Sequence, residues 1–340
     1  MFLNFCSTVR NIKIAHVYKY HINLITTPKR WLIQSHLQSL HNECNPSMGP
    51  FGDYELPMTF KNYTSKDVVI KTRLPNHCSV FDVSHMGVLE LHHTKHNLKE
   101  MASIIEQLFP LNMDILKSNK SSLSVVLNDN CHITDDFIIS NIEDEKYRLI
   151  VNGATKIQFK ETLDDKINEI GVTEVYTKMP DKIILAIQGD KSQIVLEKLL
   201  STDLSDLYFM ENRSIDNIEI SRCGYTGEDG FELYLDKQDG ITLYRELINL
   251  AKLDESIILA GLIERDILRL EAGLCLSGTE FSPNMNVHFN DANIDFVIGK
   301  KRRNDKAFIG GDNFDNTHKK YKKYKRVGFV CKRPIKKTKI

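Results

Sequence analysis

Two acidic motifs place carboxylates where a strand could present them to a ligand. The first is HITDDF, in which Asp135 and Asp136 stand where a turn becomes a strand. Because successive side chains of a strand point to opposite faces, Asp135 should share a face with Phe137 while Asp136 faces the other way. A carboxylate on a covered face needs a hydrogen-bond donor. One aspartate is therefore expected to line a cleft or to be buried beside a donor, and a turn-end aspartate that bonds only its own backbone is the alternative.

The second motif is SRCGYTGEDGFELYL, residues 221–235, which carries more polar side chains than a plain hairpin turn needs. The spacing of Gly224 and Gly227 matches neither a P-loop nor a dinucleotide-binding fingerprint. In the strand that follows, Glu232 and Tyr234 share one face and the apolar residues share the other. A lone glutamate in this position is usually solvent-exposed, so the motif leaves open whether Glu232 contacts a ligand.

A third motif, GLIERDILRLEAGL, predicts a helix with charges beside an apolar stripe. The stripe consists of Ile263, Ile267, Leu270 and Leu274. Arg265 and Arg269 fall off this stripe, so the spacing favours surface charge pairs at i,i+4 over a functional role.

The motifs stand among short strands and helices that alternate without a strict β-α-β rhythm. Strands are predicted at 67–74, 78–84, 121–127, 136–140, 147–152 and 182–189, with a hairpin at 217–235. Helices are predicted at 98–111, 155–170, 192–200, 240–251 and 261–274, and regular signals fade after Lys300. This order predicts an α+β, or mixed α/β, fold with antiparallel strand pairs.

Length and composition set broad limits on the protein class. The chain has 340 residues, of which 41% are hydrophobic, and this length favours more than one domain. No apolar run approaches the 18 or so residues of a membrane span, so no membrane partner is expected. The seven cysteines form no CxxC pair or zinc spacing, which is typical of thiols in a reducing compartment and predicts no metal site.

The net charge of zero hides an uneven distribution. Residues 1–30 contain five basic residues and no acid, which predicts a mitochondrial transit peptide, with a disordered arm as the alternative. Residues 300–340 contain 16 basic and three acidic residues, whereas 31–299 contain 24 basic and 42 acidic ones. The basic tail is interpreted as a solvated segment or a match for an acidic partner, because the acidic body opposes nucleic acid.

Taken together, several segments resemble the aminomethyltransferase (T-protein) family of the glycine cleavage system. They are FGDYELPM, FDVSHMG, ITDDFIISN, LAIQGDKSQIVL, SRCGYTGEDGFEL, GLIERDILRLEAGLCLSG and GKKRR. They follow the family's order and cover roughly residues 45–333. The resemblance implies a multidomain fold around a central channel that holds tetrahydrofolate. It also implies transfer of a methylene carbon from the aminomethyl-lipoyl arm of H-protein to tetrahydrofolate, with release of ammonia, in the mitochondrial matrix.

The same resemblance implies roles for six residues. Asp136 matches the catalytic aspartate at the reacting nitrogens of the folate, and Glu232 and Arg265 match folate-contacting residues. Three further positions fall in segments that line the pterin pocket: Met86, Asn152 and Tyr225. Glu232 is the expected acceptor for the pterin edge, with Arg265 either positioning it or binding the glutamate tail. No metal is implied.

The sequence also departs from the family pattern. Cys131 and His132 replace a Gly-Gly pair before the aspartates, Tyr54 replaces a tryptophan, and HFNDANIDF replaces a segment with Thr-Pro and Glu. The tail around KRVGFVCKRPI resembles only the first strand of the family's C-terminal barrel, most of which is expected to be missing. The predicted organisation is a transit peptide at 1–30, a folate-binding region of two interleaved subdomains at 31–299 and a basic remnant at 300–340. A folate-binding relative without glycine-cleavage activity, of the iron–sulfur maintenance type or a non-catalytic interaction protein, is the alternative.

Overall fold

The computed structural model describes residues 32–144, 146–321 and 326–328. Described residues from 32 to 326 belong to one compact unit. The predicted transit peptide at 1–30 and the tail from 329 onward, including most of the predicted barrel strand, lie outside the described residues.

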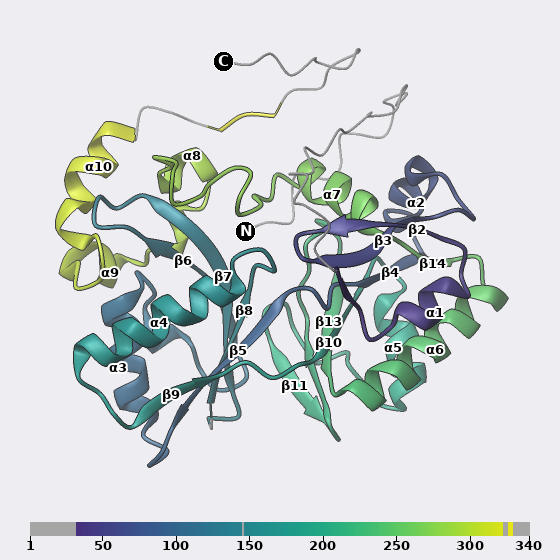
Figure 1. Ribbon diagram of the computed structural model, residues 1–340, viewed down its shortest axis with the longest axis horizontal. Coiled ribbons are helices and arrows are strands. Elements are labelled where there is room, and N and C mark those ends of the chain that lie inside the picture. Colours follow the sequence, from purple (N-terminus) through teal and green to yellow (C-terminus); the bar gives the residue numbers. More distant parts are fainter. Residues whose placement is uncertain (1–31, 145, 322–325, 329–340) are drawn as a thin grey trace. The chain divides into compact units, whose positions relative to one another are not determined.

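The strands of the described residues form three sheets (Figure 1). The six-stranded sheet has the order β11(Asn212–Ile215), β12(Ile218–Ser221), β13(Gly230–Leu235), β10(Ile183–Gln188), β4(Cys78–Asp82), β14(Ile257–Leu259). The five-stranded sheet has the order β6(Ser121–Leu127), β7(Ile133–Ile142), β8(Lys146–Val151), β5(Gly87–His93), β9(Val175–Lys178). The small sheet has the order β1(Ile33–Gln34), β3(Tyr54–Phe60), β2(Pro46–Phe51). Only β1–β3 and β4–β14 pair in parallel among these strands, so the predicted mixed α/β fold with antiparallel sheets is confirmed.

Helices cover the outer face of each large sheet. The helices of the first half of the chain are α1(Gln38–Asn42), α2(Ser65–Thr72), α3(Leu98–Leu108), η1(Met113–Ile115) and α4(Lys156–Ile170). Those of the second half are α5(Ser192–Leu200), α6(Lys237–Leu253), α7(Leu262–Glu271), α8(Phe289–Ala292), η2(Asp295–Val297), α9(Lys300–Asp305), η3(Gly311–Asn313) and α10(Phe314–Tyr321). One core packs α1, α5 and α6 on the six-stranded sheet, and another packs α3 and α4 on the five-stranded sheet.

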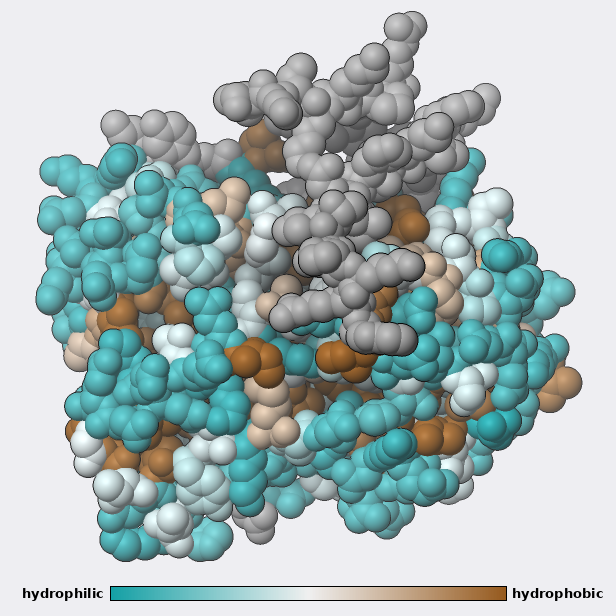
Figure 2. Space-filling model, in the orientation of Figure 1, coloured by the Kyte–Doolittle hydropathy of each residue, from teal (hydrophilic) through white to brown (hydrophobic). Residues whose placement is uncertain are grey.

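A third core joins the two large sheets. It contains residues of β4, β10 and β13 from one sheet and of β5 and β8 from the other, with α2 and α7 at its side. The inner faces of the two sheets are thus turned toward each other, and side chains on these faces meet. On the face of the molecule shown in Figure 2, hydrophilic residues cover most of the described surface and apolar residues appear as scattered patches.

The C-terminal part of the described chain packs on the β6–β7 hairpin. Phe308 and Phe314 share a core with Val125 of β6 and Ile133 of β7. The prediction that regular structure fades after Lys300 is therefore wrong, because α9 and α10 follow it. α9 contains no apolar residue, and its buried side chain is Arg302, whereas Phe314 of α10 is buried in the core that includes the hairpin.

The segment 67–74 was expected to be extended, and this is wrong because it lies mostly in α2, Ser65–Thr72. Thr64 caps the helix: its hydroxyl accepts a hydrogen bond from the backbone N–H of Asp67 (3.2 Å) and donates to the carboxylate of the same residue (2.6 Å). This local cap outweighs the strand preference of Val68 and Val69. The other predicted strands and helices exist in the structure, except that α7 ends at Glu271 and buries an unexpected face.

Candidate functional site

Strand alternation places Asp136 and Glu232 on the inner faces of the two sheets. On β7, Phe137 packs in the core that contains α3 and α4, whereas Ile138 packs against the inter-sheet core. Asp136 is two residues from Ile138 and therefore faces the inter-sheet core as well. On β13, Leu233 belongs to the outer core and Tyr234 to the inter-sheet core, so Glu232 faces inward. The predicted alternation on both strands is confirmed, and both carboxylates face the layer between the sheets.

The paired aspartates are held by one amide. Asn152, just after β8, donates from Nδ2 to Oδ1 of Asp135 (2.8 Å) and to Oδ1 of Asp136 (2.9 Å). Asp135 is buried and also accepts from the Thr155 hydroxyl (2.6 Å) and from the Asp136 backbone N–H (2.9 Å). The expected donor for a buried aspartate therefore exists, and Asn152 couples the pair although the side chains leave opposite faces of β7.

Asp136 differs from Asp135 in its exposure and in its hydrogen-bond donors. It is half-buried and has fewer donors than its neighbour. Loss of hydration raises the pKa of the Asp136 carboxyl to about 7, against the lowering effect of the Asn152 hydrogen bond, and the nearby charge of Asp135 raises it further. A carboxyl with this pKa can both accept and return a proton near neutral pH.

Glu232 lies in a buried pair with Arg265. Oε1 of Glu232 is 3.7 Å from Nη2 of Arg265, and Oε2 accepts the hydroxyl proton of Tyr234 (3.0 Å). Both charged side chains are less than a tenth exposed, so Glu232 is not on a solvent-facing surface. The Nη1 of Arg265 is buried without a hydrogen-bond partner among the described residues. An unpaired buried guanidinium nitrogen beside a loosely paired carboxylate is a site that a polar ligand could complete.

The burial of Arg265 and Arg269 corrects the predicted face of α7. The buried residues of this helix include Glu264, Arg265, Leu268 and Arg269, whereas the predicted apolar stripe is only partly covered. Arg269 donates to Glu280 (2.7 Å) and to Asp266 (2.9 Å), and Glu264 accepts from the Ser65 hydroxyl (2.5 Å). Partners from distant segments make this burial possible, and helical spacing alone does not reveal them.

Tyr225 lies within electrostatic reach of both halves of the site. Its ring is 5.0 Å from the guanidinium carbon of Arg265, and its hydroxyl donates to the backbone carbonyl of Cys275. Burial raises the pKa of the Tyr225 phenol, and the charges of Arg269 and Asp136 act on it in opposite directions. Tyr225 therefore presents a neutral aromatic surface near Asp136 and Arg265.

Met86 stands in the turn that leads from β4 of one sheet to β5 of the other. It is partly buried at the margin of the inter-sheet core. The adjacent His85 was not singled out from the sequence, and its Nδ1 is buried without a partner among the described residues. Burial, and then the charge of Arg265, lower the pKa of His85 to about 3, so its imidazole is neutral. The only feature of the sequence that could have indicated a role for His85 is its position in the FDVSHMG motif.

The remaining polar residues of the 221–235 motif stabilise its turn. Arg73 donates to Glu228 (2.7 Å), and Arg222 binds Asp229 through two nitrogens (3.0 and 2.5 Å). The hydroxyl of the buried Thr226 donates to the side-chain oxygen of Gln188 (2.9 Å). These contacts account for the acidic turn residues and leave Tyr225 and Glu232 as the residues directed toward the site.

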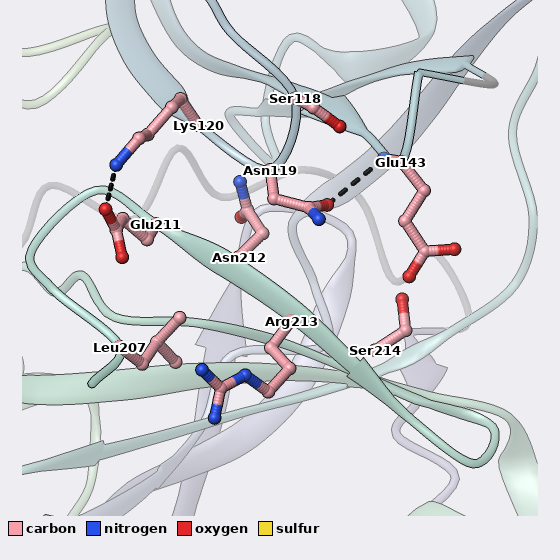
Figure 3. A pocket seen from close by; sticks show the side chains of 9 residues that line it. All are labelled: Ser118, Asn119, Lys120, Glu143, Leu207, Glu211, Asn212, Arg213 and Ser214. Atoms are coloured by element: carbon pink, nitrogen blue, oxygen red, sulfur yellow. Dashed lines mark hydrogen bonds and ion pairs between the residues drawn. The ribbon is translucent and has the colours of Figure 1, made fainter. Parts of the chain in front are cut away.

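A separate open pocket of about 290 Å³ lies at the β11 edge (Figure 3). Its lining residues are Ser118, Asn119, Lys120, Glu143, Leu207, Glu211, Asn212, Arg213 and Ser214, and none is a predicted site residue. Lys120 pairs with Glu211, and Arg213 pairs with Asp206 (2.7 Å). Lys120 and Arg213 of this pocket are thus already paired with carboxylates. The incompletely paired groups lie between the two large sheets, and we take these as the candidate site.

Comparison with known proteins decides the family. Residues 37–302 match the family model described as the GCVT N-terminal domain. An aminomethyltransferase of Thermoanaerobacter pseudethanolicus is 32% identical over 300 residues, covering 86% of this chain and 77% of its own. The chain belongs to the aminomethyltransferase family. A mitochondrial aminomethyltransferase of Pisum sativum is 31% identical over 305 residues, covering 88% of this chain and 72% of its own.

A solved structure extends the family assignment to the fold. The glycine cleavage system aminomethyltransferase T of Bartonella henselae superposes with a TM-score of 0.76 at 28% identity, covering 85% of this chain and 75% of its own. The family resemblance and the fold class expected from the motifs are confirmed, and membership of this family makes the protein a transferase. Among the described residues, no group of three or more His, Cys, Asp or Glu could hold a metal, and no helix is long and apolar enough to cross a membrane.

Proposed function

We propose that this aminomethyltransferase moves a methylene carbon from an aminomethyl-lipoyl arm to tetrahydrofolate, with release of ammonia, and that the folate binds between the two large sheets. The observation that carries the proposal is that two carboxylates in unlike surroundings lie on the inner faces of the two sheets. Asp136 has a pKa near 7, whereas Glu232 is in a buried pair with Arg265. One suits proton transfer and the other suits recognition of a ligand.

Glu232 and Arg265 form the recognition half of the proposed site. The pterin edge presents an N–H and an amino group side by side, and a carboxylate accepts two such donors well. Arg265 keeps a buried nitrogen without a partner among the described residues, which suits a ligand acceptor such as a pterin carbonyl or a folate carboxylate. Met86 and the ring of Tyr225 supply nearby apolar and aromatic surface for the flat pterin, and Asn152 acts through the aspartates it bridges.

Asp136 forms the catalytic half. The transfer forms carbon bonds to N5 and N10 of the folate and breaks the carbon–sulfur and carbon–nitrogen bonds of the aminomethyl group. The two folate N–H protons end on the lipoyl sulfur and on the departing ammonia, so atoms and charge balance. A carboxyl with a pKa near 7 can orient these nitrogens and carry a proton from one group to the next. Placement of the reacting carbon beside N5 supplies the larger part of the acceleration.

The proposed partner is the lipoylated H-protein of the glycine cleavage system, and the proposed location is the mitochondrial matrix. Relatives from Pisum sativum and Dictyostelium discoideum are named as mitochondrial, while others are bacterial. The basic, acid-free residues 1–30 favour the mitochondrial location for this chain.

The direct test combines calorimetric titration of the full chain with tetrahydrofolate and an ammonia-release assay that uses aminomethylated H-protein. Saturable folate binding together with ammonia release is expected. Folate binding without ammonia release would instead indicate a folate-binding relative, and a chain that binds no folate would refute the proposal.

A further inference from the structure

We infer that Tyr234 is a positioning residue for folate binding: it orients the Glu232 carboxylate, and Arg148 of the opposite sheet holds Tyr234 in place. This inference rests on the proposed function, in which Glu232 accepts hydrogen bonds from the pterin. It adds a residue that no resemblance assigned and that does not itself touch the ligand.

The two oxygens of Glu232 are held differently. Tyr234 donates a hydrogen bond to Oε2 at 3.0 Å, whereas the 3.7 Å from Arg265 to Oε1 is too long for a hydrogen bond. Tyr234 and Glu232 are two residues apart on β13, so their side chains leave the same face of the strand. The phenol therefore restricts the rotation of the carboxylate, which also accepts a hydrogen bond from the Cys223 side chain.

Tyr234 is suited to this role because it stays a donor. It is 2% exposed, and burial raises the pKa of its phenol, so the hydroxyl keeps its proton. The guanidinium carbon of Arg148 lies 3.9 Å from the centre of the ring. The guanidinium cation is attracted to the face of the ring. Its positive charge also makes the Tyr234 hydroxyl a stronger hydrogen-bond donor.

Arg148 ties the two sheets together at this point. It comes from β8 of the five-stranded sheet and is 1% exposed. Within the described part of the chain, the hydrogen bonds of its side chain all go to groups of the six-stranded sheet. These groups are Glu219 (2.5 Å), Ser221 (2.8 Å) and Asn212 (3.1 Å). The sheet that carries Asp136 is thereby connected to the sheet that carries Glu232 through Arg148 and Tyr234.

A buried tyrosine can also be an ordinary core residue, and the chain offers a matched example. Tyr244 of α6 is 1% exposed, and its hydroxyl bonds the Nδ1 of His41 (3.1 Å) in the core on the outer face of the six-stranded sheet. Replacing either tyrosine by phenylalanine removes one buried hydroxyl and one hydrogen bond. Only Tyr234 contacts a residue of the proposed folate site.

The test compares Tyr234→Phe and Tyr244→Phe in the full chain, with tetrahydrofolate as the titrant. Tyr234→Phe is expected to raise the Kd for tetrahydrofolate about 5- to 20-fold, which corresponds to roughly 1–1.8 kcal/mol. It should leave kcat at saturating folate within about twofold, because Asp136 is on the other sheet. Each of the two variants loses one buried hydrogen bond, so both should lower the thermal stability by a similar amount. Tyr244→Phe should nevertheless leave the Kd for tetrahydrofolate unchanged.

A double variant decides whether Tyr234 acts through Glu232. In a Glu232→Ala background, adding Tyr234→Phe should not raise the Kd further. The inference is overturned if Tyr234→Phe leaves the Kd unchanged, or if its effect persists in full without Glu232. Failure of the proposed function gives a different result, because Glu232→Ala alone would then leave folate binding intact.

Arg148→Lys, which keeps the charge but loses the flat guanidinium face, should raise the Kd only while Tyr234 is present.

Discussion

Replacing Asp136 by asparagine should make the protein inactive and, at alkaline pH, more stable. An aspartate in the unfolded chain loses its proton near pH 4, whereas Asp136 in the folded protein has a pKa of about 7. Between these values the folded state binds more protons, so stability falls as the pH rises from about 4 to about 7 and then levels off. Asparagine does not ionise, and its side-chain oxygen can still accept the Asn152 hydrogen bond.

The size of the effect follows from the two pKa values. The pKa of Asp136 rises from 3.8 to about 7, or about three pKa units, and at 1.36 kcal/mol each the ceiling is roughly 4 kcal/mol. Asp136 is half-buried rather than fully enclosed, so solvent screening reduces this to about 2 kcal/mol. The variant should therefore match the wild type near pH 4 and exceed its free energy of unfolding by about 2 kcal/mol at pH 8.

The assay is urea unfolding of the full chain, monitored by far-ultraviolet circular dichroism. It is run at about pH 4.5, 6 and 8, which span the pKa values of Asp136 in the unfolded and folded states. In parallel, ammonia release should fall at least about 100-fold while the Kd for tetrahydrofolate stays within about threefold. If the stability difference between variant and wild type does not grow with pH, the Asp136 carboxyl is not desolvated in the folded protein. Undiminished turnover would remove Asp136 from the catalytic role.

Three further outcomes are expected. Glu232→Ala should raise the Kd for tetrahydrofolate roughly 10- to 100-fold, because a charge-assisted acceptor is lost, while Glu246→Ala on the exposed side of α6 should leave the Kd unchanged in the same titration. Arg269→Met should lower the free energy of unfolding by about 2 kcal/mol, since Glu280 and Asp266 lose their buried partner; a urea midpoint equal to that of the wild type would contradict this. Thr155→Val should cost about 1–2 kcal/mol, measured the same way, because Asp135 loses a buried donor, and no loss would mean that water replaces the hydroxyl.

Much of the site was accessible from local sequence rules. Side chains alternate along every strand, so the pattern of HITDDF predicted one buried and one less buried aspartate, and GFELYL predicted that Glu232 and Tyr234 share a face. The nearly all-apolar residues at 182–189 form β10, which is an interior strand of the six-stranded sheet. The predictions about strand faces succeeded because the direction of a side chain depends only on the geometry of its own strand.

Other features depend on partners that are distant in the chain. Helical spacing assigned Arg265 and Arg269 to the surface, yet Glu232 and Glu280 approach them from other segments and make their burial possible. Nothing local indicates that Asn152 bridges both aspartates, because β7 and β8 must first pair antiparallel to bring it there.

The residue types and their spacing were enough to identify the groups that could do chemistry, the strand face that each occupies and, through the motifs, the family. Which of these faces meet depends on how the two sheets pack. The two sheets pack with Asp136 and Glu232 on their inner faces, and the same packing removes water from Asp136 and raises its pKa to about 7. The physical reason is that side-chain direction is a property of the local backbone, whereas burial and charge pairing depend on what the rest of the chain brings alongside.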